Sequence, residues 1–166
     1  KLRDKRGQTR EYWRLAIGSG DLVDMAPSSA TTQPALSHFM ADPFIFTDKG
    51  QNWVFYEAMG ADNPIGRIDV AALEGDTLGK PATALACPHH LSFPFIFRDG
   101  EDIYMLPETQ QAKRLEVWRA TDFPTKWEKH ANAFEGLYLA DSTLWQDEDK
   151  QWWLFTNISD HHAFQD

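Results

Sequence analysis

The chain has 166 residues, of which 42% are hydrophobic, 25% are charged and 13% are aromatic. This composition excludes an intrinsically disordered chain, which would be poor in aromatic residues. The formal net charge of −9 repels phosphate backbones, so we expect no nucleic-acid partner. No stretch approaches the ~20 apolar residues that span a bilayer, and residues 1–10 show no signal peptide. We therefore expect no membrane partner and a soluble protein, with the cytoplasm favoured.

Three segments of the sequence share one pattern and begin near residues 41, 92 and 140. They align without a gap as ADPFIFTDKGQNWVFYEA, SFPFIFRDGEDIYMLPET and ADSTLWQDEDKQWWLFTN. Each contains an apolar run, four polar or glycine residues, and a second apolar run rich in aromatic and β-branched residues, which is typical of a β-hairpin. A hairpin that recurs about every fifty residues indicates a repeat architecture.

Two further apolar segments follow each of the first two hairpins. Residues 67–73 and 114–121 predict third strands, and residues 82–87 and 127–130 predict outer, fourth strands. Four antiparallel strands in about fifty residues are typical of a β-propeller blade. We therefore predict an all-β fold, a β-propeller of about three four-stranded blades that forms a single partial domain over residues 1–166. The alternative is an ordinary β-sandwich with coincidentally similar hairpins.

The sequence does not contain a whole number of blades. Residues 12–19 predict a strand of a preceding or exchanged blade, whereas the third hairpin ends at Asn157 without its outer strands. An open arc exposes unpaired strand edges, and propellers have about 4–8 blades. We therefore expect either a fragment of a longer propeller or a homodimer that forms by exchange of N-terminal strands.

Four acidic residues are predicted at one mouth of the propeller channel. The pairs expected from regular hairpin pairing are Asp42 with Glu57, Phe93 with Glu108, and Asp141 with Thr156. The start of the first strand and the end of the second lie together in an antiparallel pair, so Asp42, Glu57, Glu108 and Asp141 would surround the mouth. Two carboxyl groups that flank a glycosidic bond can hydrolyse it. The alternative is that Asp42 caps a turn and Glu57 is a solvated strand end.

Two other residues near this mouth are predicted to bind a ligand. His90 precedes the second hairpin and is expected to donate a hydrogen bond to a ligand hydroxyl or to a neighbouring acid. Phe93 stands where the other two hairpins carry aspartate, so we expect it to stack on a sugar ring. Cys87 is the single cysteine, and no histidine spacing is typical of a metal site. We therefore expect no metal and no other cofactor.

Several motifs resemble those of a known family: ADPFIF, HLSFPFIF, YMLPET, RATDFPTKW and ADSTLW. They are similar to glycoside hydrolase family 43-like propeller domains that occur beside glycosyltransferase domains, such as the N-terminal domain of glucosamine inositolphosphorylceramide transferases. The resemblance covers about residues 13–157. Through the wider superfamily of families 32, 43, 62 and 68, it implies five blades and three acids in a central pocket.

The resemblance also implies roles for individual residues. The first-blade aspartate of the superfamily acts as base or nucleophile, and Asp42 matches it. A third-blade aspartate tunes the pKa and the position of its neighbours, and Asp141 matches it more loosely. The general-acid glutamate of the superfamily comes from a later blade, at a position that would lie past Asp166. Glu108 is the candidate substitute, although it does not match that motif position.

The leading hypothesis is a carbohydrate-binding or carbohydrate-processing module whose ligand is a small molecule or an oligosaccharide. Its candidate catalytic residues are Asp42, Glu108 and Asp141, and its candidate substrate-binding residues are Glu57, His90 and Phe93. If the module hydrolyses glycosides, we expect inversion with Asp42 as base and Glu108 as acid, because inverting enzymes hold their carboxyls ~6.5–9.5 Å apart. The competing hypothesis is a non-catalytic structural or protein-interaction module.

Overall fold

The computed structural model describes residues 13–21, 23, 26 and 29–159, together with the backbone of residues 2–3 and 9–10. This described part contains fifteen β-strands and a 3₁₀ helix, and none of its helices is long and apolar enough to cross a membrane. The strands are β1 Leu2–Arg3, β2 Thr9–Arg10, β3 Ala16–Ile17, β4 Thr31–Thr32, β5 Phe39–Asp48, β6 Gln51–Gly60, β7 Asn63–Glu74, β8 Thr77–Leu78, β9 Ala82–Leu85, β10 Ser92–Asp99, β11 Asp102–Glu108, β12 Leu115–Asp122, β13 Lys126–Ala133, β14 Tyr138–Gln146 and β15 Trp152–Ser159. The 3₁₀ helix is η2, Gln110–Ala112.

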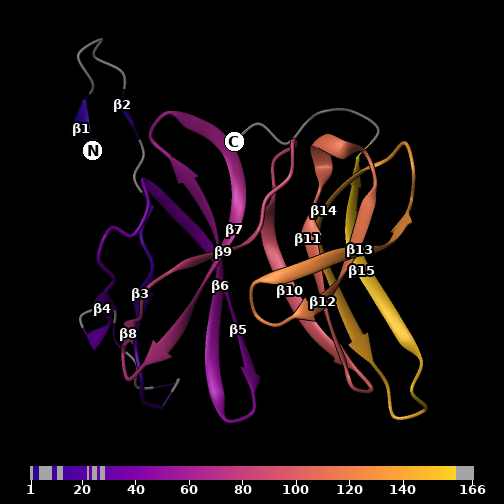
Figure 1. Ribbon diagram of the computed structural model, residues 1–166, viewed down its shortest axis with the longest axis horizontal. Helices are drawn as coiled ribbons and strands as arrows, with labels where there is room; N and C mark the ends of the chain where they lie inside the picture. Colours follow the sequence, from indigo (N-terminus) through magenta and orange to yellow (C-terminus); the bar gives the residue numbers. More distant parts are fainter. Residues whose placement is uncertain are drawn as a thin grey trace.

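Two antiparallel sheets form the centre of the molecule, with the N-terminal segment beside the first and the third hairpin beside the second (Figure 1). The first sheet has the order β5-β6-β7, and both β8 and β9 pair with β7. The second sheet has the order β10-β11-β12-β13, and β14 pairs with β15. Strand β10 contacts β5 on one side and β14 on the other. The first strands of the three repeats are therefore neighbours, as in the channel wall of a propeller.

The strands lie where the repeat pattern predicts them. Strand β7 contains the expected third strand 67–73 and β12 begins one residue after the expected start at 114, while β9 ends two residues before the expected end at 87 and β13 contains the expected fourth strand 127–130. The all-β prediction is therefore confirmed. In the N-terminal segment 12–19, the described residues form the short strand β3, which pairs with β4, while residue 12 lies outside the described part.

Each of the three hairpins contains a β-bulge near the start of its first strand, and the pairing predicted there is wrong. The residues that pair are Ala41 with Glu57, Ser92 with Glu108, and Ala140 with Asn157. At each bulge two residues of the first strand face one residue of the second, so Asp42, Phe93 and Asp141 have no directly opposite partner. A bulge arises from local backbone conformation, which the alternation of apolar residues does not encode.

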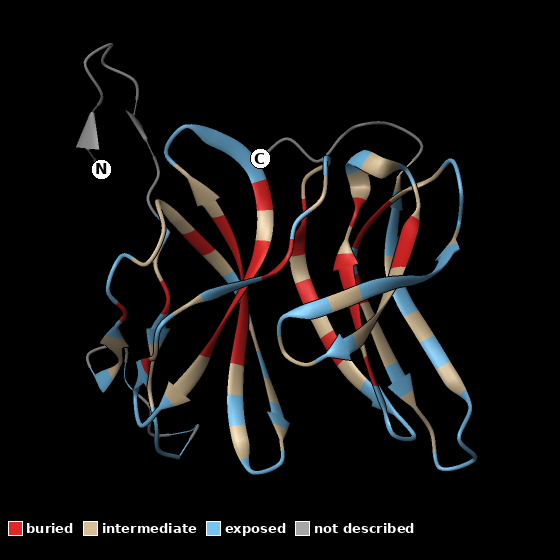
Figure 2. Ribbon diagram, in the orientation of Figure 1, coloured by how far each residue is buried: buried red, intermediate tan, exposed pale blue. Residues whose placement is uncertain are grey.

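The hydrophobic core has two parts, each on one side of the first sheet. One lies between the two central sheets and contains the fully buried Phe55, Ile68 and Met105. The other lies between the first sheet and the N-terminal segment and contains Leu15 and Met40. Buried residues accordingly concentrate in the middle of the central strands (Figure 2). Full burial of a side chain of this size contributes about 1.5–3 kcal/mol, so these contacts hold neighbouring blades together.

The third hairpin exposes a large apolar face. The side chains that form it are Trp145, Trp153 and Phe155, each at least half exposed. Among the described strands β14 and β15 pair only with each other, so this hairpin lacks the outer strands of the first two blades. Faces and edges of this kind promote association with another sheet.

We predict that the isolated chain associates through this face, as the homodimer expected from the sequence requires. Phe155→Lys should shift the chain toward the monomer, because the contact would bury an unpaired ammonium group. Sedimentation velocity at micromolar concentration measures this shift. Ile45→Lys, which changes an exposed residue of β5, is the matched control and should leave the sedimentation coefficient unchanged. A monomeric wild-type chain would contradict the dimer.

Candidate functional site

Three bulge residues occupy equivalent positions at the start of the three hairpins: Asp42, Phe93 and Asp141. All three have a positive φ, of 49°, 43° and 52°. This left-handed conformation is uncommon for residues other than glycine, is tolerated better by aspartate than by phenylalanine, and costs of order 1–3 kcal/mol. Backbone strain of this kind persists only where surrounding contacts hold it, and it is concentrated in functional sites.

A carboxylate of the preceding blade holds each of the later two bulges. The backbone N–H of Phe93 donates to Oδ2 of Asp42 over 3.2 Å, and the N–H of Asp141 donates to Oε2 of Glu108 over 3.2 Å. Asp141 in turn accepts a hydrogen bond from Nδ2 of Asn157 over 3.1 Å. The acids therefore link neighbouring blades at the same end of the strands, which brings Asp42, Glu108 and Asp141 together.

His90 and Glu57 form the second part of the cluster. Nε2 of His90 lies 2.9 Å from Oε1 of the buried Glu57. Its Nδ1 accepts a hydrogen bond from the backbone N–H of Gly66 over 3.0 Å. Both ring nitrogens are engaged when the imidazole carries its proton on Nε2. The hydrogen bond to Glu57 raises the pKa of His90, because a carboxylate favours the imidazolium form.

Two acids of the cluster are harder to ionise than an ordinary carboxyl group. Burial raises the pKa of Asp42, and the neighbouring charges of Glu57 and Asp141 raise it further. Burial also raises the pKa of Glu108, and the charges of Asp141 and Asp42 add to this effect. His90 and a backbone hydrogen bond oppose both shifts. Arg14 lines the adjoining cavity with Asp42 and Glu57, and its guanidinium donates to the carbonyls of Trp13 and His38 over 2.9 Å each.

An open cavity of about 650 Å³ adjoins the cluster between the N-terminal segment and strand β5. Asp42 and Glu57 line one part of it, and Trp13, which is 56% exposed, lines another. The N-terminal segment is held there because the N–H of Met40 donates to the carbonyl of Trp13 over 3.2 Å. The sequence did not single out Trp13, since it lies outside the repeats and is distant from Asp42 along the chain.

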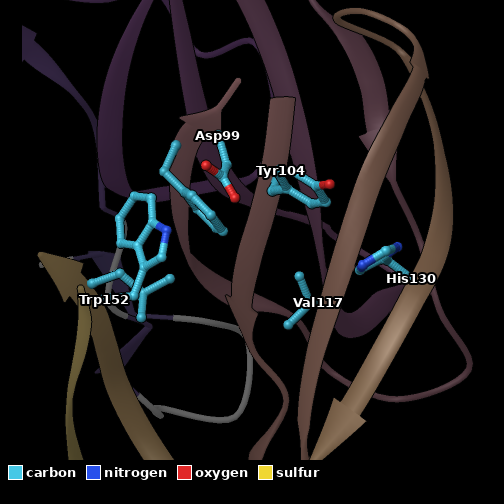
Figure 3. A pocket seen from close by; sticks show the side chains of 7 residues that line it. Asp99, Tyr104, Val117, His130 and Trp152 are labelled. Carbon is cyan, nitrogen blue, oxygen red and sulfur yellow. The ribbon is translucent and has the colours of Figure 1, made fainter. Parts of the chain in front are cut away.

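A smaller cavity of about 230 Å³ lies between the second sheet and the third hairpin (Figure 3). Its walls are mainly aromatic: Phe97 stacks on Tyr104 with ring centroids 5.4 Å apart and meets Trp152 edge-on at 5.3 Å. Asp99, the last residue of β10, is the one acid that lines it. This cavity is therefore at the hairpin-turn end of the strands, opposite the acidic cluster, and has the character of an imperfectly filled core.

All six residues proposed from the sequence thus lie at one end of the strands. The structure brings Asp42, Glu57, His90, Phe93, Glu108 and Asp141 into one acidic mouth through the contacts described above. Thr156, the predicted cross-strand partner of Asp141, instead forms a hydrogen bond with the hydroxyl of Ser142, and the two oxygens are 2.8 Å apart. Asn157 takes the predicted place of Thr156 beside Asp141, because the bulge shifts the register by one residue.

Comparison with known proteins identifies the family. A family model described as glucosamine inositolphosphorylceramide transferase 1, N-terminal, matches residues 21–166. The chain belongs to this family. It is 35% identical over 131 residues to glucosamine inositolphosphorylceramide transferase 1 of Oryza sativa subsp. indica, covering 78% of this chain and 17% of the rice protein. It is 32% identical over 161 residues to the Arabidopsis thaliana protein of the same name, covering 95% of this chain and 20% of that protein.

Solved structures of glycosidases show the same fold as this family member. The α-L-arabinofuranosidase of Lactobacillus brevis superposes with a TM-score of 0.72 at 13% identity, over 100% of this chain and 61% of that enzyme. A thermostable family-43 glycoside hydrolase superposes with a TM-score of 0.58 at 17% identity, over 78% of this chain and 52% of that one. The predicted partial β-propeller of the family 43 type is confirmed. The chain spans about a fifth of the length of its transferase relatives.

We predict that Gly66→Ala displaces His90 from Glu57. A Cβ atom at residue 66 would lie 2.5 Å from the carbonyl oxygen of Leu91 and 2.7 Å from the His90 ring, and a backbone oxygen cannot move away cheaply. The variant should lose about 1–3 kcal/mol of stability, as overpacked sites do, and the pKa of His90 should fall toward its ordinary value. Chemical denaturation and an NMR titration of His90 measure the two effects.

The matched control for this prediction is Gly60→Ala. A Cβ atom there has no neighbour closer than 4.0 Å, so neither stability nor the His90 titration should change appreciably. A Gly66→Ala variant with wild-type stability and an unchanged His90 titration would show that the close packing of Gly66 does not position the imidazole.

Proposed function

We propose that the acidic mouth binds a saccharide and prefers an amino sugar. The observation that carries this proposal is the convergence of Asp42, Glu57, Glu108 and Asp141 on one mouth beside a cavity. Clusters of like charges destabilise a fold, so a site that keeps several carboxylates together is best explained by a ligand that uses them. The family membership and the glycosidase fold support a carbohydrate as that ligand.

The lining of the mouth suits a sugar ring. Carboxylates and an imidazole accept or donate hydrogen bonds to hydroxyl groups, and aromatic faces stack on the apolar faces of sugars. The exposed Trp13 offers such a face in the cavity that Asp42 lines, and Phe93, whose backbone N–H donates to Asp42, is the second candidate. The adjoining cavity of about 650 Å³ falls within the range of small-molecule sites. A ligand of more than one ring can therefore occupy both the mouth and the cavity.

An amino sugar adds a positive charge beside the acids. The relatives are named glucosamine inositolphosphorylceramide transferase 1, and the amine of glucosamine is cationic at neutral pH. Arg14 lines the cavity beside Asp42, but its guanidinium donates to the backbone carbonyls of Trp13 and His38. A ligand ammonium group would form charge-assisted hydrogen bonds with the carboxylates of Asp42 and Glu108. Glucosamine is therefore the first ligand to test.

We predict that glucosamine binds about tenfold more tightly than glucose at pH 7, a difference of roughly 1.4 kcal/mol. Asp42→Asn combined with Glu108→Gln should abolish this preference, because the amides keep the shape and remove the charge. Lowering the pH should also abolish it, since protonation through the raised pKa values of Asp42 and Glu108 neutralises the acceptors. Isothermal titration calorimetry with both sugars measures each effect.

Asp122→Asn is the matched control for the double variant. Asp122 is exposed and pairs with Lys126 at 2.8 Å, away from the mouth, so its removal should not change sugar binding. Absence of binding by glucosamine, glucose and their oligosaccharides would overturn the proposal. It would favour the second candidate, a structural or protein-interaction module, for which the exposed apolar face of Trp145, Trp153 and Phe155 is the supporting observation.

For catalysis we propose an inverting hydrolysis in which Asp42 is the base and Glu108 the acid. The raised pKa of Glu108 is a shift in the direction that a general acid needs, because the carboxyl keeps its proton to a higher pH. The raised pKa of Asp42 makes it a stronger base once ionised. Asp141, which donates its N–H to Glu108, would position the acid. The two carboxyls lie on neighbouring blades, where a spacing of ~6.5–9.5 Å admits the attacking water.

We predict that any glycosidase activity of the chain inverts the anomeric configuration. An NMR time course of the first-formed sugar identifies the anomer, and Asp42→Asn should lower kcat by at least about 100-fold, the usual contribution of a general base. A retained anomer, or full activity of Asp42→Asn, would contradict the assignment. A chain that binds saccharides without hydrolysing them would leave the binding proposal standing and remove the catalytic one.

A further inference from the structure

A second cluster of reactive side chains lies away from the acidic mouth. Cys87 and His89 belong to the loop that follows β9, and Glu116 belongs to β12 of the next sheet. One ligand atom of each lies within 4.8 Å of the others. Nε2 of His89 is 3.7 Å from Oε2 of Glu116. The cluster thus joins the outer parts of two neighbouring sheets and contains sulfur, nitrogen and oxygen donors.

One nitrogen of the His89 imidazole is buried without a hydrogen-bond partner. This atom is Nε2, and its distance of 3.7 Å from Glu116 is too long for a hydrogen bond. Buried polar atoms in folded proteins are almost always satisfied, and a bound ion is one of the explanations for an exception.

Glu116 keeps one oxygen available toward His89. Its Oε1 accepts hydrogen bonds from Arg114 over 2.8 Å and from Lys129 over 2.7 Å. Its Oε2 accepts one bond, from Nε1 of Trp118 over 3.2 Å, and faces the imidazole. The carboxylate is fully buried, and its two cations hold it in place and keep it ionised, since its pKa is below the ordinary value despite the cost of burial.

We propose that Cys87, His89 and Glu116 bind a divalent metal ion of the zinc class. Thiolate sulfur, imidazole nitrogen and carboxylate oxygen are the ligands that Zn²⁺ takes in proteins, and three protein ligands leave a fourth position for water. The lone pair of His89 then gains its partner. Binding replaces the thiol proton of Cys87 by the metal and releases one proton to solvent. Side chains of Cys87 and His89 are partly exposed, so the ion has a path from solvent.

The neighbouring cations limit the affinity expected for the metal ion. Arg114 and Lys129 repel a dication, so the site should bind less tightly than a four-ligand structural zinc site. Metal ligation would fix the loop of residues 86–91 to β12. Because His90 lies on the same loop and contacts Glu57 in the acidic mouth, the metal would also restrict the position of that imidazole. The inference rests on Cys87, His89 and Glu116 and is independent of saccharide binding.

Titration of the purified, reduced chain with Co²⁺, followed by absorbance, tests the site. Bound Co²⁺ with a cysteine ligand gives a near-ultraviolet thiolate charge-transfer band, and Cys87 is the single cysteine of the sequence. We expect this band at one Co²⁺ per chain and its loss when Zn²⁺ is added. Cys87→Ser should remove the band, and His89→Gln should weaken Co²⁺ binding at least tenfold.

His90→Gln is the matched control, because it removes a histidine of the same loop that faces the acidic mouth instead. It should keep the band and the Co²⁺ affinity. A second measurement is thermal unfolding, in which Zn²⁺ should raise Tm for wild type and for His90→Gln but not for Cys87→Ser. Absence of the band, one Co²⁺ per two chains, or equal affinity in His89→Gln would overturn the proposed site.

Discussion

A hydrogen bond from a backbone N–H to a carboxylate of the preceding blade organises this protein. Asp42 accepts it from Phe93, and Glu108 accepts it from Asp141. The donor is in each case a bulge residue with a positive φ, a conformation that needs an external contact to persist. The same interaction therefore joins the blades, stabilises the bulges and places acids at one mouth of the arc. The geometry of the acidic cluster depends on it, whereas the raised pKa values of Asp42 and Glu108 come from burial and neighbouring acids and are opposed by this bond.

The grouping of acids at the mouth lowers the stability of the fold. Asp42 and Glu108 are ionised with difficulty because they are buried near other acids, and each charge makes its neighbour less favourable. His90 partly offsets this through its contact with Glu57, and the absence of a side chain at Gly66 allows that contact. The apolar contacts between the sheets, which include Phe55 and Met105, stabilise the fold and offset the cost of the grouped acids.

The cluster formed by Cys87, His89 and Glu116 differs from the mouth in the charges around its acid. Glu116 is fully buried, yet its carboxylate is balanced by Arg114 and Lys129, so it stays ionised. In the mouth, Glu57 is paired with His90, whereas burial and neighbouring acids raise the pKa values of Asp42 and Glu108. The loop of residues 86–91 connects the two clusters, since consecutive histidines point to different acids: His89 to Glu116 and His90 to Glu57. One loop therefore ties the outer part of the second sheet to the channel side of the first.

Local sequence determined the strands of this protein, and tertiary structure decided the site. Apolar alternation and turn residues repeat three times, and these short-range preferences are sufficient to define hairpins and their outer strands. Five short motifs that recur in order, from ADPFIF to ADSTLW, were also sufficient to indicate the family. The bulges were not predictable, because the positive φ of Phe93 depends on a carboxylate about fifty residues away. The sequence did not predict the places of Trp13 and His89 for the same reason. Trp13 shares a cavity with Asp42, and His89 lies near Glu116, only after separate parts of the chain have packed together.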